Sequence, residues 1–130
     1  LDTQRKASQA NARQLRMAIV MYADKNKGLA PAAWTELAGD YIVSGNCFLS
    51  PKRADQERDP KLAAMRCDYH LIFPGQLLEK LNQDLPILYQ KPNFDESGTV
   101  VGFVNGRVEY VDQQTLEALL KKARDAGGMP

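Results

Sequence analysis

The chain has 130 residues, of which 44% are hydrophobic and 25% charged, and its formal net charge is +1. This length is typical of one domain with a hydrophobic core of its own. The nearly neutral charge argues against a dedicated nucleic-acid binder, which usually carries a clear basic excess. No stretch approaches the ~18 consecutive apolar residues that span a bilayer, and the first residues lack the apolar core of a secretory leader.

The first pattern along the chain is a long amphipathic helix, expected from about Thr3 to Lys27. Leu15, Ile19 and Tyr22 recur at helical spacing and form an apolar stripe, which we expect to pack on an antiparallel β-sheet. Gly28 follows the last periodic residue and can adopt the left-handed conformation that ends a helix.

Charge is unevenly distributed along the chain. Residues 1–27 hold six Lys or Arg against two Asp, whereas residues 67–111 hold three Lys or Arg against six Asp or Glu. The ordinary interpretation is a solvated helix face and a mildly acidic sheet face. The functional interpretation is that opposite charges help repeated copies to pack side by side. Arg13 and Arg16 are expected to face away from the sheet, so that reversing their charges would weaken assembly and spare the fold.

The two cysteines, Cys47 and Cys67, are separated by a polar stretch rich in Lys, Arg and Asp. They form no Cys-x-x-Cys motif, and the only histidine, His70, cannot complete a four-ligand zinc site with them. Two options remain: a pair of buried free thiols, as in a cytosolic protein, or a disulfide. The disulfide is favoured because the intervening loop has little apolar content, and a bridge would stabilise it by about 3 kcal/mol. It would place the protein in an oxidising compartment.

Short elements are expected between the first helix and the last third of the chain. Apolar residues bounded by turn residues indicate strands, and brief helical periodicity indicates single helical turns. These elements are a short helix over 32–39, a helical turn over 59–65 within the long 40–67 loop, strands over 69–73 and 86–90, and a helical turn over 77–81.

The clearest strand signal is a β-hairpin over Thr99–Val104 and Arg107–Val111, with Asn105-Gly106 between the two runs. An Asn-Gly pair between β-branched and aromatic runs predicts a type I′ turn, which needs positive φ at both central residues.

A second amphipathic helix is expected over Gln113–Ala126, with Asp112 as its N-cap. We expect its apolar stripe to consist of Leu116, Leu119, Leu120 and Ala123.

Residues that could carry chemistry are few. No motif places a base beside Ser50 or Cys47, and His70 lies within an apolar run, where a packing role is the usual one. Asp95 and Glu96 could supply oxygens to a calcium ion, although two carboxylates in a polar loop are usually just solvated. The sequence therefore predicts no catalytic residue, no bound cofactor and no metal site.

Residues near both ends carry a resemblance to a known family. The segment 11–31 resembles the region that follows the membrane-spanning part of the first helix in type II secretion pseudopilins. The residues that stand at matching places are Asn11, Gln14, Leu15, Ala18, Tyr22, Ala23, Asn26, Gly28 and Pro31.

Two further segments fit the same group of pseudopilin-like proteins. Cys47–Pro51 stands where the group often shows a Cys-Pro segment, and Tyr89–Pro92 resembles its strand ending in Glu-Lys-Pro. The group is named for a His, nine residues and an Asp-Gly pair. Here Asp95 replaces that His, and nine residues separate it from Asn105-Gly106. The spacing is kept while the named residues are replaced.

The resemblance implies an α+β fold in which a long N-terminal helix packs on a small antiparallel sheet, here followed by a C-terminal helix. It implies a single pilin-like domain, residues 1–130, lacking an upstream half-helix that would anchor it in the inner membrane. Such proteins are non-enzymatic subunits of a pseudopilus or type IV pilus-like filament, with the globular part in the periplasm or outside the cell. The implied partners are other pilin or pseudopilin subunits and an inner-membrane assembly platform, with no nucleic acid.

Two alternatives remain open at this point. A pilin scaffold could serve as an extracytoplasmic module that binds a carbohydrate or a protein through the 40–68 loop, because fold does not determine function. A cytosolic regulatory or nucleic-acid-contacting domain could instead use the basic first helix, and reduced cysteines in the native protein would favour it.

Overall fold

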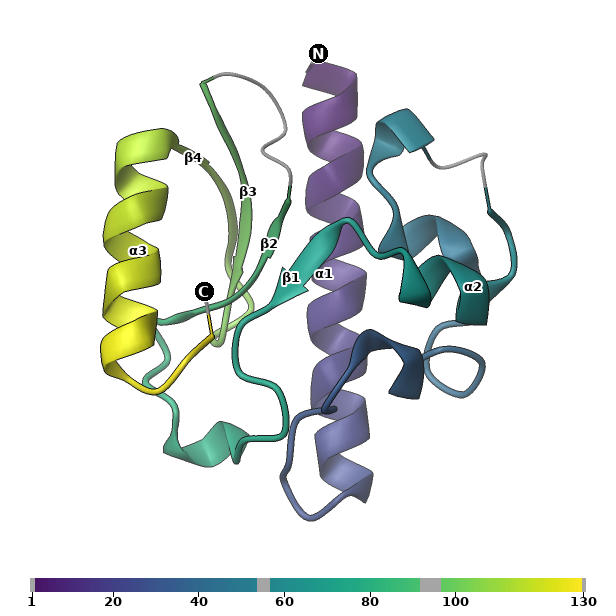
Figure 1. Cartoon of the computed structure of the whole chain (residues 1–130), viewed down its shortest axis with the longest axis horizontal. Coiled ribbons are helices and arrows are strands. Elements are labelled where there is room, and N and C mark those ends of the chain that lie inside the picture. Colours follow the sequence, from purple (N-terminus) through teal and green to yellow (C-terminus); the bar gives the residue numbers. More distant parts are fainter. Residues whose placement is uncertain (1, 54–56, 92–96, 130) are drawn as a thin grey trace.

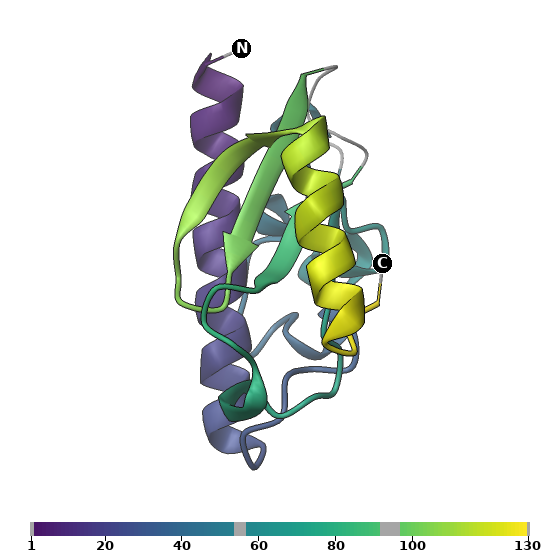
Figure 2. The same ribbon diagram turned by 90° about the vertical axis from the view of Figure 1, so that its left-hand side faces the viewer.

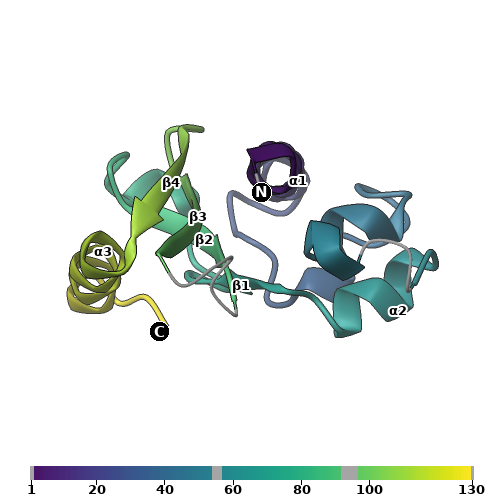
Figure 3. The same ribbon diagram turned by 90° about the horizontal axis from the view of Figure 1, so that it is seen from above.

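The computed structural model of the chain describes residues 2–53, 57–91 and 97–129. An antiparallel sheet lies between two helices, α1 and α3, and the segment that contains α2 lies on the far side of α1 (Figures 1 and 3). The expected α+β class is confirmed. The helices are α1 (Asp2–Lys25), α2 (Pro60–Met65) and α3 (Gln113–Asp125), and the strands are β1 (Tyr69–Leu71), β2 (Pro86–Gln90), β3 (Gly98–Phe103) and β4 (Val108–Asp112).

Helix α1 buries one side against the sheet and leaves the opposite side exposed. Ala12, Leu15 and Ile19 are completely buried, as their helical spacing predicts. The helix ends where Lys27 and Gly28 both take positive φ, 61° and 82°. The Gly28 amide then donates to the carbonyl of Ala23 at 2.8 Å, which is the 6→1 bond of a Schellman motif.

The four strands form a meander in the order β1-β2-β3-β4, with every neighbouring pair antiparallel (Figure 2). All residues of β2 and β3 are buried, because α1 covers one face of the sheet and α3 covers the other (Figure 3). This double cover explains why β2 and β3 show continuous apolar runs rather than an alternating pattern.

The hairpin between β3 and β4 forms at the expected place but with a different turn. The Phe103 amide donates to the Arg107 carbonyl at 2.8 Å, so the loop contains three residues, 104–106. Gly106 has φ of 95°, whereas Asn105 is not among the residues with positive φ. The expected type I′ turn is therefore wrong. A three-residue loop that ends on a left-handed glycine replaces it, and only one residue needs the unusual conformation.

Helix α3 begins and ends close to the expected positions. The Asp112 carboxylate accepts a hydrogen bond from the Thr115 amide at 2.7 Å, which confirms the N-cap. Leu116 and Ala123 are buried, and Leu119 and Leu120 pack partly buried against the core. The stripe is the one predicted, and it faces the side of the sheet that α1 does not cover.

Two details of the first forty residues differ from expectation. The ring and hydroxyl contacts of the Tyr22 side chain are with the segment that follows α1 rather than with a strand. Its ring lies 5.6 Å from that of Tyr41, and its hydroxyl donates to the Glu36 carboxylate. The short helix expected over 32–39 is reduced to a 3-10 turn, Trp34–Glu36.

A buried polar network joins α1 to the sheet and to the segment before β1. The hydroxyls of Ser8 and Tyr69 lie 2.8 Å apart, and Ser8 also donates to the Gln90 side chain. The Ser50 amide donates to the Asp68 carboxylate at 2.7 Å. All five residues are buried, so these bonds satisfy groups that would otherwise be costly to remove from water.

Arg16 does not face away from the sheet as expected. Its guanidinium donates to the Val104 carbonyl at 2.8 Å in the β3–β4 turn, whereas Arg13 is exposed. The two arginines are three residues apart on α1, and only Arg16 lies on the side that meets the hairpin. Reversing both charges would therefore test two different things at once.

We predict that Arg16→Ala lowers the free energy of unfolding by about 1–2 kcal/mol, because it removes a charge-assisted hydrogen bond to a turn carbonyl. Arg13→Ala is the matched control and should change stability by less than about 0.5 kcal/mol, as expected of an exposed position. Urea unfolding of both variants measures the difference. Equal stabilities would contradict the structural role of Arg16.

Candidate functional site

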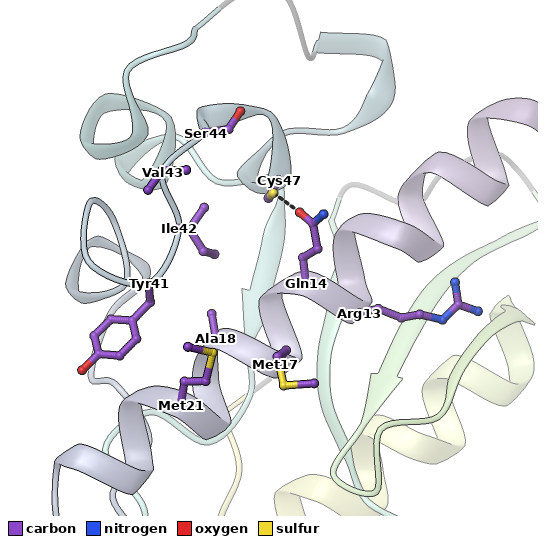
Figure 4. Close-up of a pocket in the computed structure, with 10 residues that line it drawn as sticks. All are labelled: Arg13, Gln14, Met17, Ala18, Met21, Tyr41, Ile42, Val43, Ser44 and Cys47. Atoms are coloured by element: carbon purple, nitrogen blue, oxygen red, sulfur yellow. Dashed lines mark hydrogen bonds between the residues drawn. The ribbon is translucent and has the colours of Figure 1, made fainter.

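An apolar concavity lies between α1 and residues 41–47 (Figure 4). We call it the α1 groove, and it has a volume of about 550 Å³. Grooves of this size and apolar character are the usual places where a ligand or a partner side chain binds. Its lining residues are Arg13, Gln14, Met17, Ala18, Met21, Tyr41, Ile42, Val43, Ser44 and Cys47.

One wall of the groove is a pair of methionines on α1. Met17 and Met21 are four residues apart, so they lie on the same side of the helix, one turn from each other. Their exposed fractions are 53% and 47%. Methionine side chains are flexible and polarizable, and they are over-used at surfaces that accept varied partners. The pair stands on the outward side of α1, away from the sheet.

The opposite wall is a tight turn of the chain that presents Val43 to solvent with 80% of its surface exposed. The Ile42 amide donates to the Leu37 carbonyl at 2.9 Å, and the Gly39 amide donates to the Ile42 carbonyl at 2.8 Å. These bonds hold the backbone next to Val43 in place. An exposed valine beside two exposed methionines makes a continuous apolar surface, which marks an interaction site more often than scattered single residues do.

Cys47 lies at the inner end of the groove, where its thiol donates to the Gln14 side-chain oxygen (Figure 4). Burial raises the pKa of this thiol above its ordinary value. A thiol kept protonated by burial is a poor nucleophile and a poor metal ligand. The residue therefore contributes packing and a polar contact to the groove.

The disulfide expected between Cys47 and Cys67 is not formed in the structure, where both are free thiols. Each has a separate contact, since Cys67 accepts a hydrogen bond from the Tyr69 amide at 3.4 Å. The segments that carry them are nevertheless neighbours, because the Asp68 amide donates to the Phe48 carbonyl at 2.8 Å. Burial of Cys67 raises the pKa of its thiol to about 12.

This shifted pKa predicts a loss of stability in alkaline solution. The unfolded chain releases the Cys67 proton near pH 8.5, whereas the folded chain holds it up to about 12. Between these values the unfolded state binds fewer protons, so the free energy of unfolding falls as pH rises. In protein kept reduced, the free energy of unfolding of Cys67→Ser should fall less steeply between about pH 9 and 12 than that of the unmodified chain, measured by urea unfolding at each pH. Parallel slopes for the two proteins would contradict the shift.

The other residues considered in the sequence do not gather into a reactive site. His70 contacts the Met129 carbonyl at 3.1 Å and the Tyr89 ring, and Ser50 accepts a hydrogen bond from Lys52. Asp95 and Glu96 lie outside the described residues. Within residues 2–53, 57–91 and 97–129, no three His, Cys, Asp or Glu side chains are grouped as a metal site would require.

Met17, Met21 and Val43 were not predicted as site residues. The sequence does contain a signal for the first two, because an i, i+4 methionine pair stands on the face of α1 that carries Arg13. Val43 has no comparable signal, since it lies in a loop without periodicity. Its position opposite the methionines depends entirely on how the 37–47 segment folds back onto α1.

Searches with protein-family models, against curated proteins and against solved structures found no match to this chain. In the described residues, no helix combines the length and apolar character that crossing a membrane requires.

Proposed function

We propose that this chain is a non-enzymatic structural subunit of a pilin-like filament, of the kind built by type II secretion or type IV pilus machines. The observation that carries the proposal is the pair of exposed methionines on α1, Met17 and Met21, and the continuation of this surface across the α1 groove. A long helix that anchors the domain on one side and exposes methionines on the other can hold a second protein along its length. The resemblance of segment 11–31 to pseudopilins supports the same function.

The arrangement of the helices favours assembly through α1. The sheet, α3 and the segment with α2 occupy the other sides of the domain, while one side of α1 stays open along its length (Figure 3). Exposed Met17 and Met21 lie on α1, and exposed Val43 lies across the α1 groove from them. A partner that covered them would remove apolar surface from water, which is the main driving force of association.

We predict that the chain self-associates weakly in solution and that Met17→Lys with Met21→Lys reduces the association constant at least tenfold. Charged side chains at these positions would have to be desolvated in the contact. Sedimentation velocity over a range of concentrations measures the effect.

The matched control is Leu62→Lys with Met65→Lys, because these exposed apolar residues, 48% and 68% accessible, stand on α2. This control should associate like the unmodified chain. Equal loss in both double variants would show that the groove has no special role, and unchanged association of the groove variant would contradict the proposal.

The proposed function also places the domain outside the cytoplasm, where cysteine pairs are oxidised. The residues that follow Cys47 and Cys67 are already joined by a backbone hydrogen bond, so the two segments need little movement to approach each other. We expect protein isolated from its own cells under alkylating conditions to contain a Cys47–Cys67 bridge, detected by mass spectrometry without reduction. Two alkylated cysteines would favour the cytosolic alternative.

A second candidate function is ligand binding in the α1 groove by an extracytoplasmic module on the same scaffold. The observation that favours it is the concave shape of the groove, with polar Gln14 and Ser44 among its lining residues. The two functions differ in the sedimentation experiment, because a ligand-binding module remains monomeric at all concentrations and gains thermal stability when its ligand is added.

A further inference from the structure

We infer that a second groove of the domain binds the C-terminal end of an extended apolar peptide whose fourth residue from the end is basic. The groove lies along the C-terminal half of α1, beside the β3–β4 turn and the 3-10 turn Leu78–Lys80 (Figure 2). We call it the hairpin groove. Its volume is about 470 Å³, and it shares no lining residue with the α1 groove. Peptide binding here would not depend on the proposed filament function.

Backbone hydrogen bonds hold the walls of the hairpin groove in place. The Leu78 amide donates to the Gly28 carbonyl at 3.0 Å, which fixes the 3-10 turn against the end of α1. The Val104 amide donates to the Leu85 carbonyl at 2.9 Å, which fixes the β3–β4 turn against the segment before β2. Walls tied in this way are formed before a ligand arrives, as is usual for binding sites of about 300–1,000 Å³.

Most of the lining between the two turns is apolar. Ala23, Ile87 and Val104 are at most 6% exposed, and Val20 and Leu78 are half-buried. These side chains come from α1, β2 and the two turns, so an occupant would be contacted by several elements at once. Removal of its apolar side chains from water would supply the main driving force for binding.

Arg16 supplies a carboxylate-binding group at the end of the groove next to the β3–β4 turn. Its guanidinium donates to the Val104 carbonyl at 2.8 Å, and this bond uses only one of its five N–H donors within the described residues. An added Cβ at Gly106 would stand 3.2 Å from Nη1, so the turn lies against the guanidinium and restricts it. A restricted guanidinium with unused donors is suited to binding a carboxylate.

Acidic side chains predominate at the other end of the groove. Asp24 stands eight residues after Arg16 on α1, about 12 Å along the helix axis, and Glu79 stands on the 3-10 turn. Lys27 also lines this end, so two acids stand with one base. Within residues 2–53, 57–91 and 97–129, no ion pair engages any of these three side chains. This end therefore attracts a cation.

The two ends together determine the occupant and its direction. An extended chain rises about 3.3 Å per residue, so a peptide of four residues spans the distance between Arg16 and Asp24. The β3–β4 turn stands at the Arg16 end (Figure 2). A chain that terminates there avoids the turn, and its terminal carboxylate meets the guanidinium. The basic side chain of its first residue then reaches Asp24 and Glu79, and the residues between place apolar side chains on the lining.

A peptide titration followed by NMR tests this assignment on the 130-residue chain. The probe is the acetylated tetrapeptide Lys-Leu-Ala-Val with a free C-terminal carboxylate, added to isotope-labelled protein. We expect saturable shifts of the backbone amides of Leu78, Val104 and Gly106, and none at Val43 in the α1 groove. The same peptide with a C-terminal carboxamide should bind about tenfold more weakly, because it loses a charge-assisted hydrogen bond to Arg16.

A charge exchange tests the other end of the groove. Asp24→Lys with Glu79→Lys should weaken binding of the probe about tenfold, and a Glu-Leu-Ala-Val peptide should bind this variant more tightly than it binds the unmodified chain. The matched control is Glu117→Lys with Asp125→Lys, which makes the same change in net charge at exposed positions of α3. It should bind both peptides as the unmodified chain does. Circular dichroism checks that both variants fold.

Four results would overturn the assignment. Equal binding of the carboxylate and carboxamide peptides would show that Arg16 does not recognise a chain end. Equal weakening by the groove and α3 variants would reduce the effect to net charge. Octanoate that binds as tightly as the peptide would make the groove a site for alkyl carboxylates, and absence of shifts around it would exclude a peptide site. Self-association is measured separately, so each of these results leaves the proposed filament function standing.

Discussion

Burial of α1 is the constraint on which the rest of the domain depends. Leu15 and Ile19 of α1 are inaccessible to solvent where the helix packs on the sheet. Without α1, one apolar face of the sheet would be exposed to water. The same helix also holds the segment before β1, because Asn11 donates to the Leu49 carbonyl at 3.2 Å. Without α1, the strands and the 45–68 segment would lack the shared surface on which both pack.

The polar bonds around Ser8 give this arrangement its alignment along the helix. Hydrophobic contact is non-directional, so an apolar stripe could slide by a turn at modest cost. The Ser8 hydroxyl, which meets Tyr69 and Gln90 in the interior, permits one position only, because any shift would leave buried polar groups without partners. Arg5 and Arg16 act similarly nearer the two ends of the hairpin, on Tyr110 and Val104.

The face of α1 that remains exposed follows from this alignment. Because Ser8 and Arg16 determine which side meets the sheet, Arg13, Met17 and Met21 must point outward. Exposed methionines on an otherwise anchored helix are costly for an isolated domain and useful for one that assembles. The geometry that stabilises the domain therefore also determines which surface of α1 would be open to the proposed neighbouring subunit.

The sequence by itself determined the secondary elements with strong local signals. The α1 periodicity, the Asp112 cap and the β-rich runs around residue 105 depend on neighbours in the chain, and the structure confirms their positions. The turn type depended on the strand register, so Asn105-Gly106 could not decide it. The helical pattern shows which side of α1 is polar, so it predicts an exposed Arg16. It does not show that the β3–β4 turn lies within reach of that side chain. Val43 and the α1 groove came only from the tertiary structure, because a cavity is formed by segments that are distant along the chain.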